Sequence, residues 1–200
     1  QFDLAKLNVS NIEKIEIING PQSILYGSNA IGGAIVITSK NSLNPNEVTL
    51  NIDSNKTIST AISGSHKLNN YQTNWSINSI ISEGFSSSHD PNRSINDEDG
   101  ISSYAMNFNI NSPVSSDYRY GFSTRFQKEN IDLDKGGGSG TDDHNYKSNT
   151  QEIFSRVNFE KFWNDTFSSN FNYGYVNQFR KSTDGNDSYQ TYSDRSSYRG

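Results

Sequence analysis

Residues 11–40 read NIEKIEIINGPQSILYGSNAIGGAIVITSK, and this stretch is the most informative part of the chain. It begins with an apolar, isoleucine-rich segment at 12–18, which predicts a β-strand. The dipeptide Gly20-Pro21 should end that strand, because glycine permits a positive φ and proline has no N–H to donate. Proline also suits the first position of a helix, so the break is expected to lead into a helical turn.

The second half of the stretch predicts a short helix followed by another strand. Ser23 to Ser28 should form one or two helical turns that Gly27 closes. The pair Gly32-Gly33 lets two backbones approach closely, and the apolar run 34–38 should then form the second strand. Taken alone, this order also fits a β-turn-α-β segment of any small α+β domain.

Order, spacing and residue type together resemble the end of the plug domain of TonB-dependent outer-membrane transporters. The residue after Gly20-Pro21 is often basic in that family and is Gln22 here, which leaves the resemblance intact. The resemblance implies a structural role for the signature residues Gly20, Pro21, Tyr26, Gly27, Gly32 and Gly33. It is carried by Ile12, Glu13, Ile15, Glu16, Gly20, Pro21, Ser23, Leu25, Tyr26, Gly27, Ala30, Ile31, Gly32, Gly33, Ile35 and Ile37.

Composition excludes several classes of protein. Only 31% of residues are hydrophobic, and the mean hydropathy of −0.79 would suit a disordered chain. However, the net charge is only −5 and the chain has 11 Phe and 11 Tyr, which oppose disorder. No apolar run is long enough for a transmembrane helix. The absence of cysteine excludes disulfides, and the mildly acidic charge argues against nucleic acid as a partner.

From Glu47 onward, apolar and polar residues alternate with a period of two, which indicates half-buried strands. On 118–126, Tyr120, Phe122 and Phe126 share one face, whereas Arg119 and Arg125 share the other. Outer-membrane barrels show this pattern, with apolar residues towards lipid and polar ones towards a wet lumen. A soluble antiparallel sheet with one wet face remains the alternative, although segments such as 71–85 exceed the usual strand length. The predicted strands are 47–54, 57–67, 71–85, 102–111, 117–130, 149–162, 166–180 and an eighth after Ser188.

The parity predicts that Tyr120, Phe122, Phe126, Phe171 and Tyr173 face lipid, while Arg119, Arg125, Asn170 and Asn172 face the lumen. Links between the strands alternate in length apart from a tight first hairpin near Asn55. Short periplasmic turns and long extracellular loops are typical of outer-membrane barrels. The predicted short links are 68–70, 112–116 and 163–165, and the predicted long links are 86–101, 131–148 and 181–187.

Nothing in the sequence predicts an enzyme. His66, His89 and His144 lack the spacing of a zinc site. The glycine-rich segment 135–140 lacks the Lys-Ser/Thr ending of a phosphate-binding loop.

Acidic residues gather in the two predicted outer loops, and calcium takes six to eight oxygen ligands, many of them from aspartate. Two such loops above one barrel could form a calcium site, whereas solvated loop acids are the simpler interpretation. Their placement also resembles the cobalamin-transporting branch of the family, whose outer loops bind calcium. The candidate ligands are Asp97, Asp99, Asp132, Asp134, Asp142 and Asp143.

The resemblance implies an α+β plug segment at 1–42 and an all-β transmembrane antiparallel barrel beginning at 43–200. Such barrels have about 22 strands, so the chain is expected to be incomplete at both ends, with the TonB-contacting segment upstream of Gln1. The implied function is energised uptake of a scarce, large nutrient across the outer membrane of a Gram-negative bacterium. Expected partners are outer-membrane lipid, the inner-membrane TonB complex and a nutrient such as cobalamin or a siderophore. Cobalamin is preferred here; a ferric-siderophore receptor and a soluble or surface β-sheet binding protein are the alternatives.

Overall fold

The computed structural model describes residues 12–26, 30–39, 46–54, 56–85, 98–113, 117–133, 145–185 and 187–199. The chain divides into two compact units, residues 1–42 and 43–200. The described part forms a two-stranded sheet in the first unit and an eight-stranded sheet in the second. Within the described ranges, no helix is long and apolar enough to cross a membrane.

The first unit is a hairpin that a short helix interrupts. Strand β1 (Ile12–Asn19) pairs antiparallel with β2 (Gly33–Ser39), and the single-turn helix α1 (Ser23–Tyr26) lies between them in sequence. Gly20 follows β1 with a φ of 90°. Glycine adopts this conformation readily because it has no Cβ. The predicted order of strand, break, helix and strand is therefore confirmed.

Two backbone contacts fix the segment between the strands. The N–H of Gln22 donates to the carbonyl of Ala30 at 2.8 Å, and the N–H of Tyr26 donates back to the carbonyl of Gln22 at 2.9 Å. Ala30 is buried at 7% exposure. The described helix ends at Tyr26, and Gly27 lies outside the described residues.

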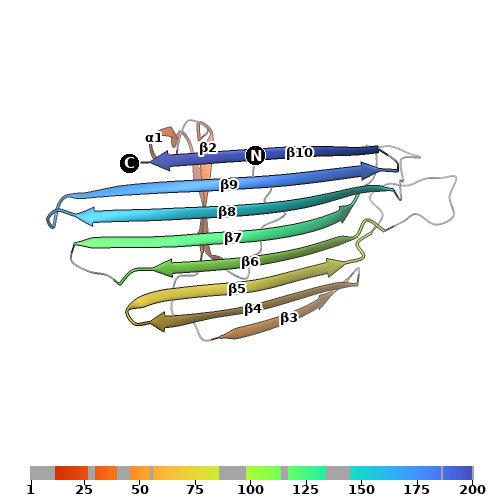
Figure 1. The fold of residues 1–200 in the computed structure, drawn as a ribbon, viewed down its shortest axis with the longest axis horizontal. Helices are drawn as coiled ribbons and strands as arrows, with labels where there is room; N and C mark the ends of the chain where they lie inside the picture. The colour runs from red at the N-terminus through yellow and green to blue at the C-terminus, as the bar shows by residue number, and fades with distance from the viewer. Residues whose placement is uncertain are drawn as a thin grey trace. The chain divides into compact units, whose positions relative to one another are not determined.

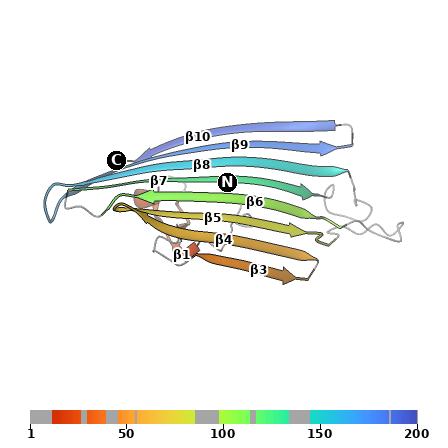
Figure 2. The same cartoon turned by 60° about the horizontal axis from the view of Figure 1, so that its bottom comes forward.

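The second unit is a meander in which every strand pairs antiparallel with its neighbour in sequence (Figure 1). β3 and β10 are the two edges of the described sheet, and the same order is visible in Figure 2. The eight predicted strands are confirmed to within a few residues at each end. They are β3 (Glu47–Asp53), β4 (Thr57–Leu68), β5 (Tyr71–Ser82), β6 (Ile101–Asn111), β7 (Tyr118–Asp132), β8 (Tyr146–Phe162), β9 (Ser168–Asp184) and β10 (Asp187–Arg199).

Register aligns the apolar residues of successive strands on one face of the sheet. One row across five strands consists of Ile62, Ile77, Met106, Phe126 and Ile153. Each of these side chains is between 39% and 54% exposed. Burying such side chains in water-soluble proteins stabilises the fold by about 1.5–3 kcal/mol each. Their common exposure therefore indicates that this face meets a medium other than water.

The opposite face is polar, and several of its polar side chains are buried. The adjacent row consists of Ala61, Asn78, Ala105, Gln127 and Glu152. Asn78 is 2% exposed and Gln127 is 6% exposed. Soluble proteins bury apolar rather than polar residues, so the sheet shows the reverse arrangement. This distribution opposes the soluble-sheet alternative and agrees with the parity predicted from the sequence.

The exposed apolar face has a definite height. On β8 its apolar residues run from Ile153 to Phe159 between the polar residues Gln151 and Lys161, and beyond Gln151 the same face continues with Asn149 and Lys147. Strands advance about 3.3 Å per residue, and a tilt of about 40° is usual in membrane barrels. The stretch from Gln151 to Lys161 would therefore span about 25 Å across a membrane, which is the height of the apolar band in outer-membrane barrels.

Strand directions place the two long links, 83–100 and 133–145, at one end of the sheet and the short links, 69–70, 112–117 and 163–167, at the other. The prediction of a third long link at 181–187 is wrong. Instead, β9 and β10 form a tight hairpin in which Asp184 pairs with Asp187. Gly185 has a φ of 57°, a conformation that suits two-residue hairpin turns.

Candidate functional site

The polar face of the sheet is the surface of the second unit on which uncharged hydrogen-bonding groups gather. Asn107 donates through Nδ2 to Ser76 Oγ at 3.0 Å, and Asn78 donates to the same oxygen at 3.4 Å. Ser76 and Asn78 are both nearly inaccessible, at 1% and 2% exposure. Buried polar groups need such partners, because an unpaired group loses its hydration without compensation.

A charged cluster continues this network across β7, β8 and β9. The Arg125 guanidinium donates to Gln127 Oε1 and is attracted by the carboxylates of Glu152 and Glu129. Gln178 in turn donates to Glu152 at 3.3 Å. Both signs of charge are therefore present within a few residues, and the polar face offers donors as well as acceptors.

Towards the short-link end, arginine side chains also lie on the polar face. Arg119 lies 3.7 Å from Glu160 and places its guanidinium 4.7 Å from the centre of the Phe162 ring. Arg156 donates to Asn172 Oδ1 at 2.7 Å. A row of guanidinium, amide and hydroxyl groups can bind water and polar ligands along its length.

The acidic loop residues are only partly within the described structure. Asp99 and Asp132 are described, whereas Asp97, Asp134, Asp142 and Asp143 lie outside the described residues. Among the described residues there is no group of three or more acids, histidines or cysteines suited to a metal ion. The calcium site therefore stays a prediction.

The bases of the two acidic loops are adjacent. The N–H of Asp132, at the end of β7, donates to the carbonyl of Gly100 at 2.9 Å. The Asp132 carboxylate also lies 3.0 Å from the Lys147 ammonium at the start of β8. The bases of the two acidic loops are therefore close together, as a shared metal site would require. However, Asp132, one of the candidate ligands, already pairs with Lys147.

A second ion cluster at the same end was not visible from the sequence. Lys56, in the turn between β3 and β4, hydrogen-bonds to Glu83 and lies 3.9 Å from Glu98. The hydrogen bond to Glu83 and the nearby negative charges raise the pKa of Lys56. The same hydrogen bond lowers the pKa of Glu83. The cluster connects the first hairpin turn to both ends of the link 83–100, whose residues are far from Lys56 in sequence.

Among the signature residues of the first unit, Gly33 has the clearest structural reason for its identity. Its φ is 147°, and a Cβ built on it would lie 2.5 Å from the carbonyl oxygen of Ile18 in the paired strand. A Cβ on Gly32 would meet nothing within 4 Å among the described residues. The structure therefore explains Gly33 by its own hairpin, whereas the requirement for Gly32 stays a prediction.

Comparisons with known proteins show which proteins this chain is similar to. Residues 1–34 match the family model described as TonB-dependent Receptor Plug Domain. The fold is similar to the crystal structure of the siderophore receptor PiuA from Acinetobacter baumannii, with a TM-score of 0.70 and 13% sequence identity. The chain thus begins with a segment similar to the plug of TonB-dependent receptors, and the sheet that follows has the fold of such a receptor. The predicted family and fold class are thereby confirmed.

The structural match covers 87% of this chain and 27% of the PiuA chain, so the receptor segment described here spans about a quarter of the length of that protein. At this identity the match concerns the fold alone. The eight-stranded sheet has the fold of part of a receptor barrel. Neither comparison supports the cobalamin-transporting branch in particular.

Proposed function

We propose that this receptor segment belongs to an outer-membrane protein that takes up a siderophore-type nutrient with energy from the TonB complex. One observation carries the proposal: the sheet exposes apolar side chains on one face and buries polar ones such as Asn78 and Gln127 on the other, directly after a plug segment in sequence. The exposed face would meet the lipid of the outer membrane of a Gram-negative bacterium. The polar face would line the lumen that the substrate crosses.

The proposed substrate class is a siderophore. The similar solved structure is that of a siderophore receptor. The preference for cobalamin rested on the plug signature and the acidic loops, and most of the candidate loop acids lie outside the described residues. Cobalamin is therefore the comparison substrate in the test below rather than the proposed one.

Transport, rather than catalysis, is the activity that the polar face suits. Its guanidinium and carboxylate groups are engaged with one another, as in the contacts of Arg125 with Gln127 and of Arg119 with Glu160. The TonB complex of the inner membrane would supply the energy through the plug. The membrane and TonB are thus the proposed macromolecular partners.

Uptake by cells tests the proposal directly. The full-length gene is deleted from its host, and accumulation of a radiolabelled iron–siderophore complex and of labelled cobalamin is measured in parallel. We expect iron uptake to fall on deletion, to return on complementation and to be absent from a strain without TonB, while cobalamin uptake is unchanged. Loss of cobalamin uptake alone would reverse the substrate assignment, and loss of neither would overturn the proposed uptake function.

A further inference from the structure

Lys161, a lysine at the border of the apolar face of the sheet, lies among aromatic rings at the short-link end. Lys161 of β8 is directly opposite Tyr118 of β7. Its ammonium group lies 4.7 Å from the centre of the Tyr118 ring and 4.4 Å from that of Trp163, and it donates to the Tyr118 hydroxyl at 3.0 Å. The rings hold the cation by attraction to their π faces.

Lys161 differs from Lys56 and Lys147 in that its contacts are with aromatic residues and not with acids. Lys147 pairs with Asp132 at 3.0 Å, and Lys56 pairs with Glu83 and Glu98. Within the described ranges, by contrast, the contacts of Lys161 are with the two aromatic residues. An ammonium group has three N–H donors, and Tyr118 accepts only one of them. The positive charge of Lys161 is therefore available to an anion.

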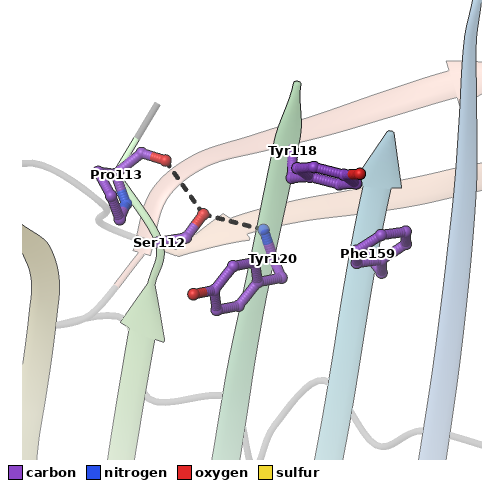
Figure 3. Close-up of a pocket in the computed structure, with 5 residues that line it drawn as sticks. All are labelled: Ser112, Pro113, Tyr118, Tyr120 and Phe159. Carbon is purple, nitrogen blue, oxygen red and sulfur yellow. Dashed lines mark hydrogen bonds between the residues drawn. The ribbon is translucent and has the colours of Figure 1, made fainter. Parts of the chain in front are cut away.

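An apolar pocket, whose lining residues are shown in Figure 3, adjoins this lysine on the same face, because Lys161 is paired with the pocket residue Tyr118. It has a volume of about 220 Å³ and is lined by Ser112, Pro113, Tyr118, Tyr120 and Phe159. Tyr118 is shared between the pocket and the Lys161 contact, and its ring centre lies 5.9 Å from that of Phe159.

The polar atoms around the pocket are already engaged within the protein. The Ser112 hydroxyl accepts from the N–H of Tyr120 at 3.0 Å and donates to the carbonyl of Pro113 at 3.2 Å. The hydroxyl of Tyr120 is hydrogen-bonded to that of Tyr71, and the two rings meet edge to face with centres 6.1 Å apart. The pocket therefore presents mainly apolar surface.

The order of these features along the strands matches an amphipathic ligand. The pair Tyr120 and Phe159, which lines the pocket, lies one row further from the short links than the pair Tyr118 and Lys161. One row on the same face corresponds to about 7 Å along a strand. The cation therefore lies on the aqueous side of the pocket and at the border of the apolar band, where the phosphate groups of one membrane leaflet would lie.

We propose that Tyr118, Lys161 and Trp163 bind the phosphate of an anionic phospholipid whose glycerol and first methylene groups occupy the adjoining pocket. This inference rests on the proposed function only in that the apolar face must lie in a membrane. It does not depend on which nutrient the receptor transports. Lys161 supplies the charge, Tyr118 orients it, and Trp163, whose Nε1 donates to Ser169 at 3.0 Å, closes the other side.

The test uses the purified full-length receptor in nanodiscs of phosphatidylcholine with a minor fraction of phosphatidylglycerol. Native mass spectrometry counts the lipids that stay bound after gentle release from the disc. We expect the wild-type receptor to retain phosphatidylglycerol in preference to phosphatidylcholine. We expect Lys161→Gln to lower that preference about tenfold, the factor that corresponds to about 1.4 kcal/mol, and Lys161→Arg to keep it.

Lys128→Gln is the matched control, because Lys128 is also exposed on this face but belongs to the row at the opposite border of the apolar band. An equal loss in Lys128→Gln and Lys161→Gln would reduce the effect to general charge and overturn the site. The wild-type receptor tests the site without any variant, since equal retention of both lipids overturns it. Failure of the wild-type receptor to fractionate with outer membranes would instead overturn the proposed membrane function.

Discussion

Gly33 is held by its own hairpin in a conformation that other residues adopt only with strain. A side chain there would collide with the carbonyl oxygen of Ile18, 2.5 Å from the Cβ position, in addition to requiring a φ of 147°. We expect Gly33→Val to destabilise the hairpin by at least about 1–3 kcal/mol, the usual cost of one strained backbone position. The amount of folded receptor in outer membranes, measured by its shifted mobility on unheated gels, should fall.

Gly32→Val is the control for this substitution, since no described atom lies within 4 Å of a Cβ at Gly32. If the two variants reach the same level in the membrane, the hairpin contact is not the reason for glycine at position 33. A loss in both would instead support the wider packing requirement predicted from the sequence for the glycine pair.

The ion pair between Lys56 and Glu83 should contribute to stability only within a window of pH. The pKa of Lys56 is raised from 10.5 by its hydrogen bond to Glu83, so its contribution is lost as pH rises through that raised value. The pKa of Glu83 is lowered from 4.5 by its hydrogen bond to Lys56, so its contribution is lost as pH falls through that lowered value. Both side chains are largely exposed, and salt should weaken their interaction.

A double-mutant cycle measures this contribution. Lys56→Ala, Glu83→Ala and the double variant are compared by thermal unfolding at neutral pH and at a pH well below the ordinary pKa of glutamate. We expect a favourable coupling at neutral pH that disappears in acid and shrinks in high salt. A coupling that is unchanged in acid cannot come from the charge on Glu83.

The orientation of a whole strand follows from the alternation on β7. Phe122 and Phe126 lie on the exposed apolar face, while Ser123, Arg125 and the buried Gln127 lie on the polar one. Single cysteines at 122 and 126 should react with a probe confined to the membrane, because they would face lipid. Cysteines at 123 and 125 should react with a small water-soluble reagent that enters the lumen. The opposite labelling pattern would refute the assignment of the two faces.

The strands were predictable because their signal is local. A period of two in side-chain type is visible within about ten residues, so β7 and β8 could be located before any pairing was known. The turn between β9 and β10 was missed although Gly185-Asn186 is a hairpin signal in the sequence. The mistake arose because the end of β9, with the sequence KSTD at 181–184, is polar, and hydropathy alone assigned it to a loop.

The side-chain clusters could not be predicted in this way, because they join residues that are distant in sequence. Lys56 meets Glu83 across 27 positions. The pocket beside Lys161 combines residues from the end of β6, from β7 and from β8. Such contacts depend on the register between strands, which the turns and the hydrophobic pattern set together. The sequence could therefore identify the faces of the sheet but not the partners on them.

The direction of the whole sheet across the membrane is set by the links between its strands. The links 83–100 and 133–145 lie at one end, together with the ion pairs of Lys56 and Lys147. The aromatic residues around Lys161 and the short turns lie at the other end. Because short turns are periplasmic and long loops extracellular in outer-membrane barrels, the end that carries 133–145 should face the outside of the cell.

Epitope insertion tests this direction. A short tag placed after Gly138, within the link 133–145, should bind antibody on intact cells. The same tag placed after Asn164, in the turn 163–167, should bind antibody only after the outer membrane is permeabilised. Both insertions leave the strands uninterrupted, so the mobility of the unheated receptor on gels serves as the check on folding. Binding at Asn164 on intact cells would reverse the direction of the sheet and would move the Lys161 site to the outer leaflet.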